Sequence, residues 1–106
     1  MILETSQSLV CLHVAFPRSL EEEVLDVCRA IADMPGFTVI AADGFGQGAH
    51  LHTVRETVLG RAQRRLLMIV ANRTICDRVV SALRHALPTP EAAYWVVAVS
   101  EFGRLA

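Results

Sequence analysis

Two histidines separated by one residue are the side chains of this sequence best suited to holding a metal ion. His50 and His52 form an H-x-H pattern. In an extended chain, residues i and i+2 point to the same side, so both imidazoles can reach one ion. Two ligands do not complete a site, because zinc takes four ligands, or three and a water. Another subunit would have to supply the others, and the alternative is a pair of solvated loop histidines.

A cluster of arginines follows the histidines and suits an anion. Arg61 and Arg65 would share one face of a strand, with Arg64 on the other. Guanidinium groups bind phosphate or carboxylate through paired hydrogen bonds. Arg61 and Arg64 are therefore candidate ligand-binding residues. The alternative is a solvated strand end whose arginines pair with Glu56 or Asp43.

A glycine-rich segment, GFGQGA from Gly44 to Ala49, precedes both groups and fits a relaxed dinucleotide pattern. A Rossmann fold would need an acidic residue after the next strand and more parallel strands than this chain can form. Two interpretations remain open. The segment is a turn with positive φ angles, or its successive backbone N–H groups form an anion-binding nest.

The first half of the chain predicts strand, helix and strand. Residues 8–16 are apolar on both alternating faces, which is typical of a covered strand. Ser19 and Glu22 fit a capping box at the start of a helix that ends at Pro35. Residues 37–42 predict a second strand. The connection over residues 44–60 is long for a hairpin, and residues 51–59 form a short helix or extend the strands.

The second half repeats the pattern, with a strand over residues 63–71 and another over residues 92–100. Between them, Thr74 and Asp77 predict a helix start. The order β-α-β-β-α-β predicts an α+β, ferredoxin-like sandwich with a four-stranded antiparallel sheet and both helices on one face.

The two helices leave the second sheet face uncovered, which predicts self-association through that face. Tyr94 and Trp95 should point to opposite faces, one under the helices and one on the bare side. His13 is expected to be a hydrogen-bonded core or interface residue. His85 is expected on a helix surface.

Composition narrows the function classes for the 106 residues, which we expect to form a single domain over 1–106. The sequence is 53% apolar and carries a formal net charge of −1, so it lacks the basic excess of a nucleic-acid-binding protein. Three widely spaced cysteines indicate reduced, buried thiols and a cytoplasmic protein. The apolar runs are too short for membrane insertion.

With these motifs in this order, the sequence resembles the nitrogen regulatory PII proteins. More narrowly, it resembles an uncharacterised PII-like family often encoded beside heavy-metal efflux pumps. The strand that runs into Gly44 and Gly46 and the projecting loop carry the broader likeness. The narrower likeness covers nearly the whole chain and rests on four short pieces. They are Pro35-Gly36-Phe37, residues 56–61 (ETVLGR), the arginine-rich third strand, and Tyr94-Trp95-Val96 with Gly103-Arg104-Leu105.

The resemblance implies a homotrimer with inward-facing sheets, ligand clefts between subunits, and a loop that contacts transporters or enzymes. Gly44 and Gly46 match the glycines at the loop base, and Gln47 falls near a phosphate-binding position. The Arg and Lys of the PII motif are missing, and residues 87–90 (LPTP) replace its nucleotide turn. A metal ion, divalent or copper, or a small anion therefore fits better than ATP.

The leading hypothesis is a non-catalytic, trimeric regulatory protein that senses a metal ion or a small anion or nucleotide. It would signal through residues 44–60 to a partner such as a metal-efflux transporter. The alternative is a small dimeric enzyme of the monooxygenase or isomerase type, with His13 as the eligible residue of a sheet–helix pocket. RNA binding is disfavoured because the third strand has no aromatic residue.

Overall fold

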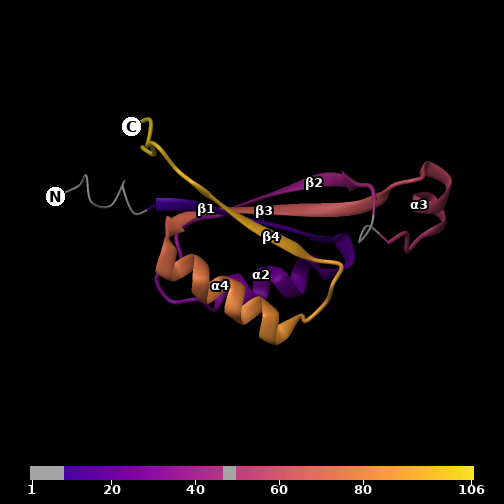
Figure 1. Cartoon of the computed structure of the whole chain (residues 1–106), viewed down its shortest axis with the longest axis horizontal. Helices are drawn as coiled ribbons and strands as arrows, with labels where there is room; N and C mark the ends of the chain where they lie inside the picture. The colour runs from indigo at the N-terminus through magenta and orange to yellow at the C-terminus, as the bar shows by residue number, and fades with distance from the viewer. Residues whose placement is uncertain (1–8, 47–49) are drawn as a thin grey trace.

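The computed structural model describes residues 9–46 and 50–106. It shows a four-stranded antiparallel sheet with two helices on one face (Figure 1). The strand order is β2-β3-β1-β4. The strands are β1 (Leu9–Pro17), β2 (Thr38–Gly44), β3 (Ala62–Asn72) and β4 (Ala93–Ala98). The helical elements are η1 (Arg18–Leu20), α2 (Glu21–Arg29), α3 (Val54–Leu59) and α4 (Arg73–Ala86). The predicted ferredoxin-like order and the α+β class are confirmed, with α3 as an addition.

The covered face of the sheet carries the core, because alternate residues of each strand point toward α2 and α4. Leu12, Val14 and Phe16 of β1 lie beside Leu67 and Ile69 of β3, and all five are buried. The helices complete the core with buried residues of their own, namely Val24, Cys28, Cys76 and Val79. Within the described residues, none of the helices has the length and hydrophobicity to cross a bilayer.

Both helices begin differently from the prediction. Ser19 lies inside the 3₁₀ turn η1, and the N–H of Glu21 already bonds to the Arg18 carbonyl, so the predicted Ser19–Glu22 capping box is wrong. Helix α2 also ends at Arg29, well before Pro35. Helix α4 begins one residue before Thr74, because the side chain of Asn72, the last residue of β3, caps it instead.

The bare face of the sheet is apolar. Strand register places Cys11 beside Val70 and Val97, and His13 beside Met68 and Trp95. The His13 and Trp95 rings stack with centroids 5.1 Å apart, and Trp95 remains 44% exposed. Tyr94 lies on the helix side, so the predicted division of this aromatic pair is confirmed. His13 is an intermediate-exposure residue whose Nδ1 has no hydrogen-bond partner within the described chain.

All three cysteines are free thiols, as predicted. Cys28 and Cys76 are buried, and Cys11 is half-buried on the bare face. Burial raises the pKa of the Cys28 thiol to about 11, and it also raises the pKa of Cys11 and of Cys76. Because thiolates are the reactive form, these side chains behave as small core residues at neutral pH.

The cap of α4 generates a stability prediction. The Asn72 Oδ1 accepts a hydrogen bond of 2.9 Å from the Ile75 N–H. We expect Asn72→Ala to lower the free energy of unfolding by about 1 kcal/mol, because a helix N–H loses its acceptor. Asn72→Asp, which keeps an acceptor, should retain most of that stability. Urea denaturation of the three proteins is the measurement, and an unchanged Asn72→Ala midpoint would contradict the assignment.

Candidate functional site

Helix α3 projects beyond the end of the sheet, from the connection between β2 and β3 (Figure 1). The Thr53 hydroxyl accepts a hydrogen bond of 3.0 Å from the Glu56 N–H, and the Glu56 carboxylate accepts one of 3.1 Å from the Thr53 N–H. This capping box starts the helix. Gly60 ends it with φ 71°, a left-handed conformation that glycine adopts without strain. Of the two predicted alternatives, the connection therefore takes the short helix.

Glu56 ties this projection to the sheet. Its side chain is only 3% exposed, and its carboxylate accepts backbone N–H bonds from His52 (2.6 Å), Thr53 and Gln63. These donors hold the pKa of Glu56 below its ordinary value, with the Gln63 N–H as the largest cause. One carboxylate thus joins the segment that enters α3 to the start of β3.

The two predicted metal ligands lie together in the segment before α3. The ring centroids of His50 and His52 are 6.5 Å apart, with the rings inclined at 50°. His52 Nε2 also lies 3.0 Å from a carboxylate oxygen of Glu91, a residue of the turn before β4. Within residues 9–46 and 50–106, no group of three metal-ligating side chains gathers in one place.

Arg64 reaches the same turn from the bare face of β3. Its guanidinium donates a hydrogen bond of 2.7 Å to the Glu91 carbonyl. Partial burial lowers the pKa of Arg64, and the nearby Glu91 charge opposes that effect. His52 therefore holds this turn through the Glu91 side chain, and Arg64 holds it through the Glu91 carbonyl. We call His50, His52, Arg64 and Glu91 the projection base.

The other two arginines lie apart from this group. Arg61 precedes β3 rather than sharing a strand face with Arg65, and its guanidinium lies 3.4 Å from the Asp43 carboxylate. Arg65 points to the helix side and pairs with Glu21 of α2 at 2.5 Å. The prediction that Arg64 faces away from Arg65 agrees with the strand register. The Arg61–Asp43 pair was among the alternatives that the sequence left open.

The glycine segment is described only in part. Gly44 ends β2, and Gly46 has φ 91°, which agrees with a turn that needs positive φ. Phe45 between them is exposed. Gln47, the third predicted anion ligand of this segment, lies outside the described residues, as do Gly48 and Ala49. The antiparallel sheet excludes the Rossmann interpretation.

The side chains of the projection base offer groups that can bind ligands. Two imidazoles offer nitrogen ligands to a transition metal ion, and the Arg64 guanidinium offers N–H donors to an anion. His52 and Arg64 each contact Glu91, through its carboxylate and its carbonyl. A ligand on either side chain would share that side chain with the Glu91 turn.

Comparison with known proteins identifies the family. A family model described as "Protein of unknown function (DUF3240)" matches residues 5–106. This chain belongs to the DUF3240 family. A comparison with curated proteins gave no match.

Solved structures share the fold of this DUF3240 chain. A DUF3240 family protein from Shewanella baltica OS155 is similar with a TM-score of 0.74 and 13% identity, over 93% of this chain and 98% of that one. CPII, a nitrogen regulatory PII-like protein from Thiomonas intermedia K12 bound to ADP, AMP and bicarbonate, gives a TM-score of 0.62 and 11% identity. That match covers 83% of this chain and 86% of CPII.

A proposed PII-like signalling protein from Thermus thermophilus gives a TM-score of 0.60 and 17% identity, over 83% of each chain. At these identities the likeness establishes the fold. The predicted resemblance to an uncharacterised PII-like family is confirmed.

Sequence reasoning missed two acidic residues of this DUF3240 site. Thr53 and Glu56 fit the T-x-x-E capping pattern, which would have placed both α3 and its carboxylate anchor. Glu91 had no comparable signal, because its role depends on the turn before β4 reaching β3 and the projection. The alternative enzyme site also needs correction, since His13 lies on the bare face and not between sheet and helices.

The Glu56 anchor generates a second prediction. In Glu56→Gln we expect faster amide hydrogen exchange at His52, Thr53 and Gln63, because a neutral amide has only one acceptor oxygen for three donors. In the parent protein the depressed pKa means that protection persists at neutral pH and falls as the pH drops through that low pKa. NMR exchange measurements test both effects. Glu101→Gln, in the exposed tail, is the control, and equal exchange in both variants would refute the anchor.

Proposed function

We propose that this DUF3240 protein is a trimeric, PII-like regulatory protein without catalysis. It senses a metal ion, or a small anion or nucleotide, at clefts between subunits and signals through residues 44–60 to a partner such as a metal-efflux transporter. The observation that carries the proposal is the projection base, where metal-ligating and anion-binding side chains hold the same turn.

The coupling at Glu91 supports a sensing role. A metal ion on His50 and His52 would take the nitrogen that now lies 3.0 Å from the Glu91 carboxylate. An anion on Arg64 would compete for the N–H that now bonds to the Glu91 carbonyl. Either ligand changes how the projection is held to the turn before β4, which is the step that a partner would detect.

The proposed ligands, a metal ion or a small anion or nucleotide, are supported by the side chains present and by the ligands of CPII. CPII was solved with two nucleotides, ADP and AMP, and with a small anion, bicarbonate. In this chain the histidine pair adds nitrogen ligands suited to zinc, copper, nickel or cobalt. One chain supplies only the two imidazoles of His50 and His52, so a second copy of the chain would supply the remaining metal ligands. Three free thiols accord with the expected cytoplasmic setting.

The bare face supports assembly. Trp95 and Val97 are 44% and 48% exposed on a face whose other residues are mostly apolar. Such a contiguous apolar surface is stabilised when other copies cover it. A trimer with sheets turned inward would bury this face and bring each projection base beside a neighbouring subunit.

The partner contact falls on α3. Val54 and Val58 are 82% and 78% exposed, and their spacing of four residues puts them on one side of the helix. Two exposed valines on a short, anchored helix form a small apolar contact surface that the fold itself does not use. We therefore expect a protein partner to bind this side of the projection.

The assembly predicts a particle of three chains of 11.6 kDa, about 35 kDa by light scattering. We expect Val97→Glu to shift the mass toward the monomer, because the substitution places charge in the buried interface. Val58→Glu is the matched control, because α3 projects away from the sheet, and its mass should not change. A parent protein that scatters as a single chain would overturn the trimer.

Ligand binding is tested by calorimetric titration with Zn²⁺, Ni²⁺, Co²⁺, Cu⁺, ADP and AMP. We expect His52→Ala to weaken metal binding by about tenfold or more, since one of two imidazole ligands is lost. Arg64→Gln should weaken nucleotide binding instead. His85→Ala and Arg78→Gln, both exposed on α4, are the matched controls. No binding of any of these ligands at millimolar concentration would overturn the sensing role.

A further inference from the structure

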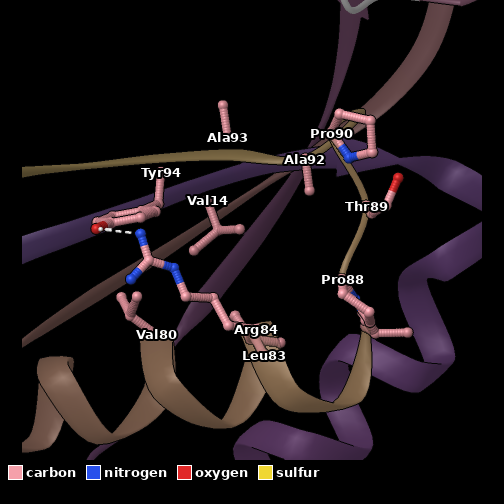
Figure 2. Close-up of a pocket in the computed structure, with 11 residues that line it drawn as sticks. Val14, Val80, Leu83, Arg84, Pro88, Thr89, Pro90, Ala92, Ala93 and Tyr94 are labelled. Atoms are coloured by element: carbon pink, nitrogen blue, oxygen red, sulfur yellow. Dashed lines mark hydrogen bonds between the residues drawn. The ribbon is translucent and has the colours of Figure 1, made fainter.

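A cavity of about 430 Å³ lies between α4 and β4, and none of the four residues of the projection base lines it (Figure 2). It exists because α4 packs over β1 and β3, while β4 is the edge strand beyond β1. Figure 1 shows β4 crossing the sheet obliquely above α4. The helix side of this edge strand faces α4 across the cavity, with Tyr94 in contact with Arg84.

The walls of the cavity are mostly apolar, and two prolines lie at one end. Val14 of β1 forms the back, Val80 and Leu83 of α4 form one side, and the Ala92 methyl points in from the opposite side (Figure 2). Leu87 and two prolines, Pro88 and Pro90, complete the turn that closes one end. Proline fixes φ, which restricts the backbone at these two positions of the turn.

The mouth of the cavity carries a single positive charge. Arg84 reaches from α4 toward Tyr94, and its Nη2 donates a hydrogen bond of 3.2 Å to the phenol oxygen (Figure 2). The guanidinium carbon also lies 5.3 Å from the centroid of the Tyr94 ring. No carboxylate of residues 9–46 or 50–106 lies within 4.0 Å of the Arg84 guanidinium, whose remaining N–H donors are free for a ligand.

We propose that this cavity binds an amphipathic carboxylate, namely a medium-chain, unbranched fatty acid. The carboxylate accepts hydrogen bonds from the Arg84 guanidinium and the Tyr94 hydroxyl at the mouth. The alkyl chain lies between Val14, Val80 and Leu83, where it is removed from water. Apolar walls with one convergent charged group are the composition that such a ligand requires. The lining residues include no His, Asp, Glu or Cys, so the cavity binds this ligand without reacting with it.

Titration with sodium decanoate, below its micelle concentration and followed by calorimetry, is the test. We expect saturable binding of one decanoate per chain. Arg84→Gln should weaken it by about tenfold or more, because a charge-assisted hydrogen bond is lost. Arg78→Gln, an exposed arginine of the same helix outside the cavity, is the matched control and should bind as the parent does. Decanol, which has the same chain without charge, should bind more weakly than decanoate.

A second variant separates this cavity from other apolar surfaces. Ala92→Phe fills the space that its methyl now borders, so decanoate binding should be lost while circular dichroism shows an intact fold. Three results would each overturn the proposal: no saturable binding by the parent, equal weakening in Arg84→Gln and Arg78→Gln, or undiminished binding in folded Ala92→Phe. None of these results bears on the projection base, so a failure here leaves the proposed sensing role untouched.

Discussion

Two helices on one side can cover only one of the two faces of a four-stranded sheet. Most surface features of this chain follow from that constraint. Helices α2 and α4 bury the inner faces of β1 and β3, where the largest core side chains lie. The opposite face remains apolar, with Trp95 stacked on His13. The edge strand β4 meets α4 only through contacts such as Arg84 with Tyr94, and a cavity lies between these two elements. The proposed interface for other copies and the proposed ligand cavity both depend on how the two helices cover the sheet.

The turn before β4 links the two regions that we assign to binding. Glu91 meets His52 and Arg64, while its neighbours Pro90 and Ala92 line the cavity. A ligand in the cavity and a ligand at the projection base therefore act on the same short segment. Their binding free energies are coupled to the extent that each ligand favours a different position of this turn, and any such coupling is reciprocal.

The element order and the bare face were predictable because they depend on local pattern: alternating apolar strands, two amphipathic helices and proline–glycine ends. The placement of Tyr94 and Trp95 followed from strand alternation alone. The predicted helix starts at Ser19 and Thr74 were not recovered, because Ser19 lies inside η1 and Asn72 caps α4 in place of Thr74. Glu91 was unpredictable because its importance comes from a contact between segments far apart in the sequence.

The anchoring of α3 limits how the proposed signal can travel. Glu56 holds the segment before the helix and the start of β3 through three backbone N–H groups, including that of His52, and it makes no use of the His52 imidazole or of Glu91. A ligand that displaces Glu91 from His52 leaves these bonds in place. The projection would then move as an anchored unit about its attachment to β2 and β3, instead of unfolding. Val54 and Val58 keep their spacing on the helix during such a movement, so a partner would detect a change in the position of one fixed surface.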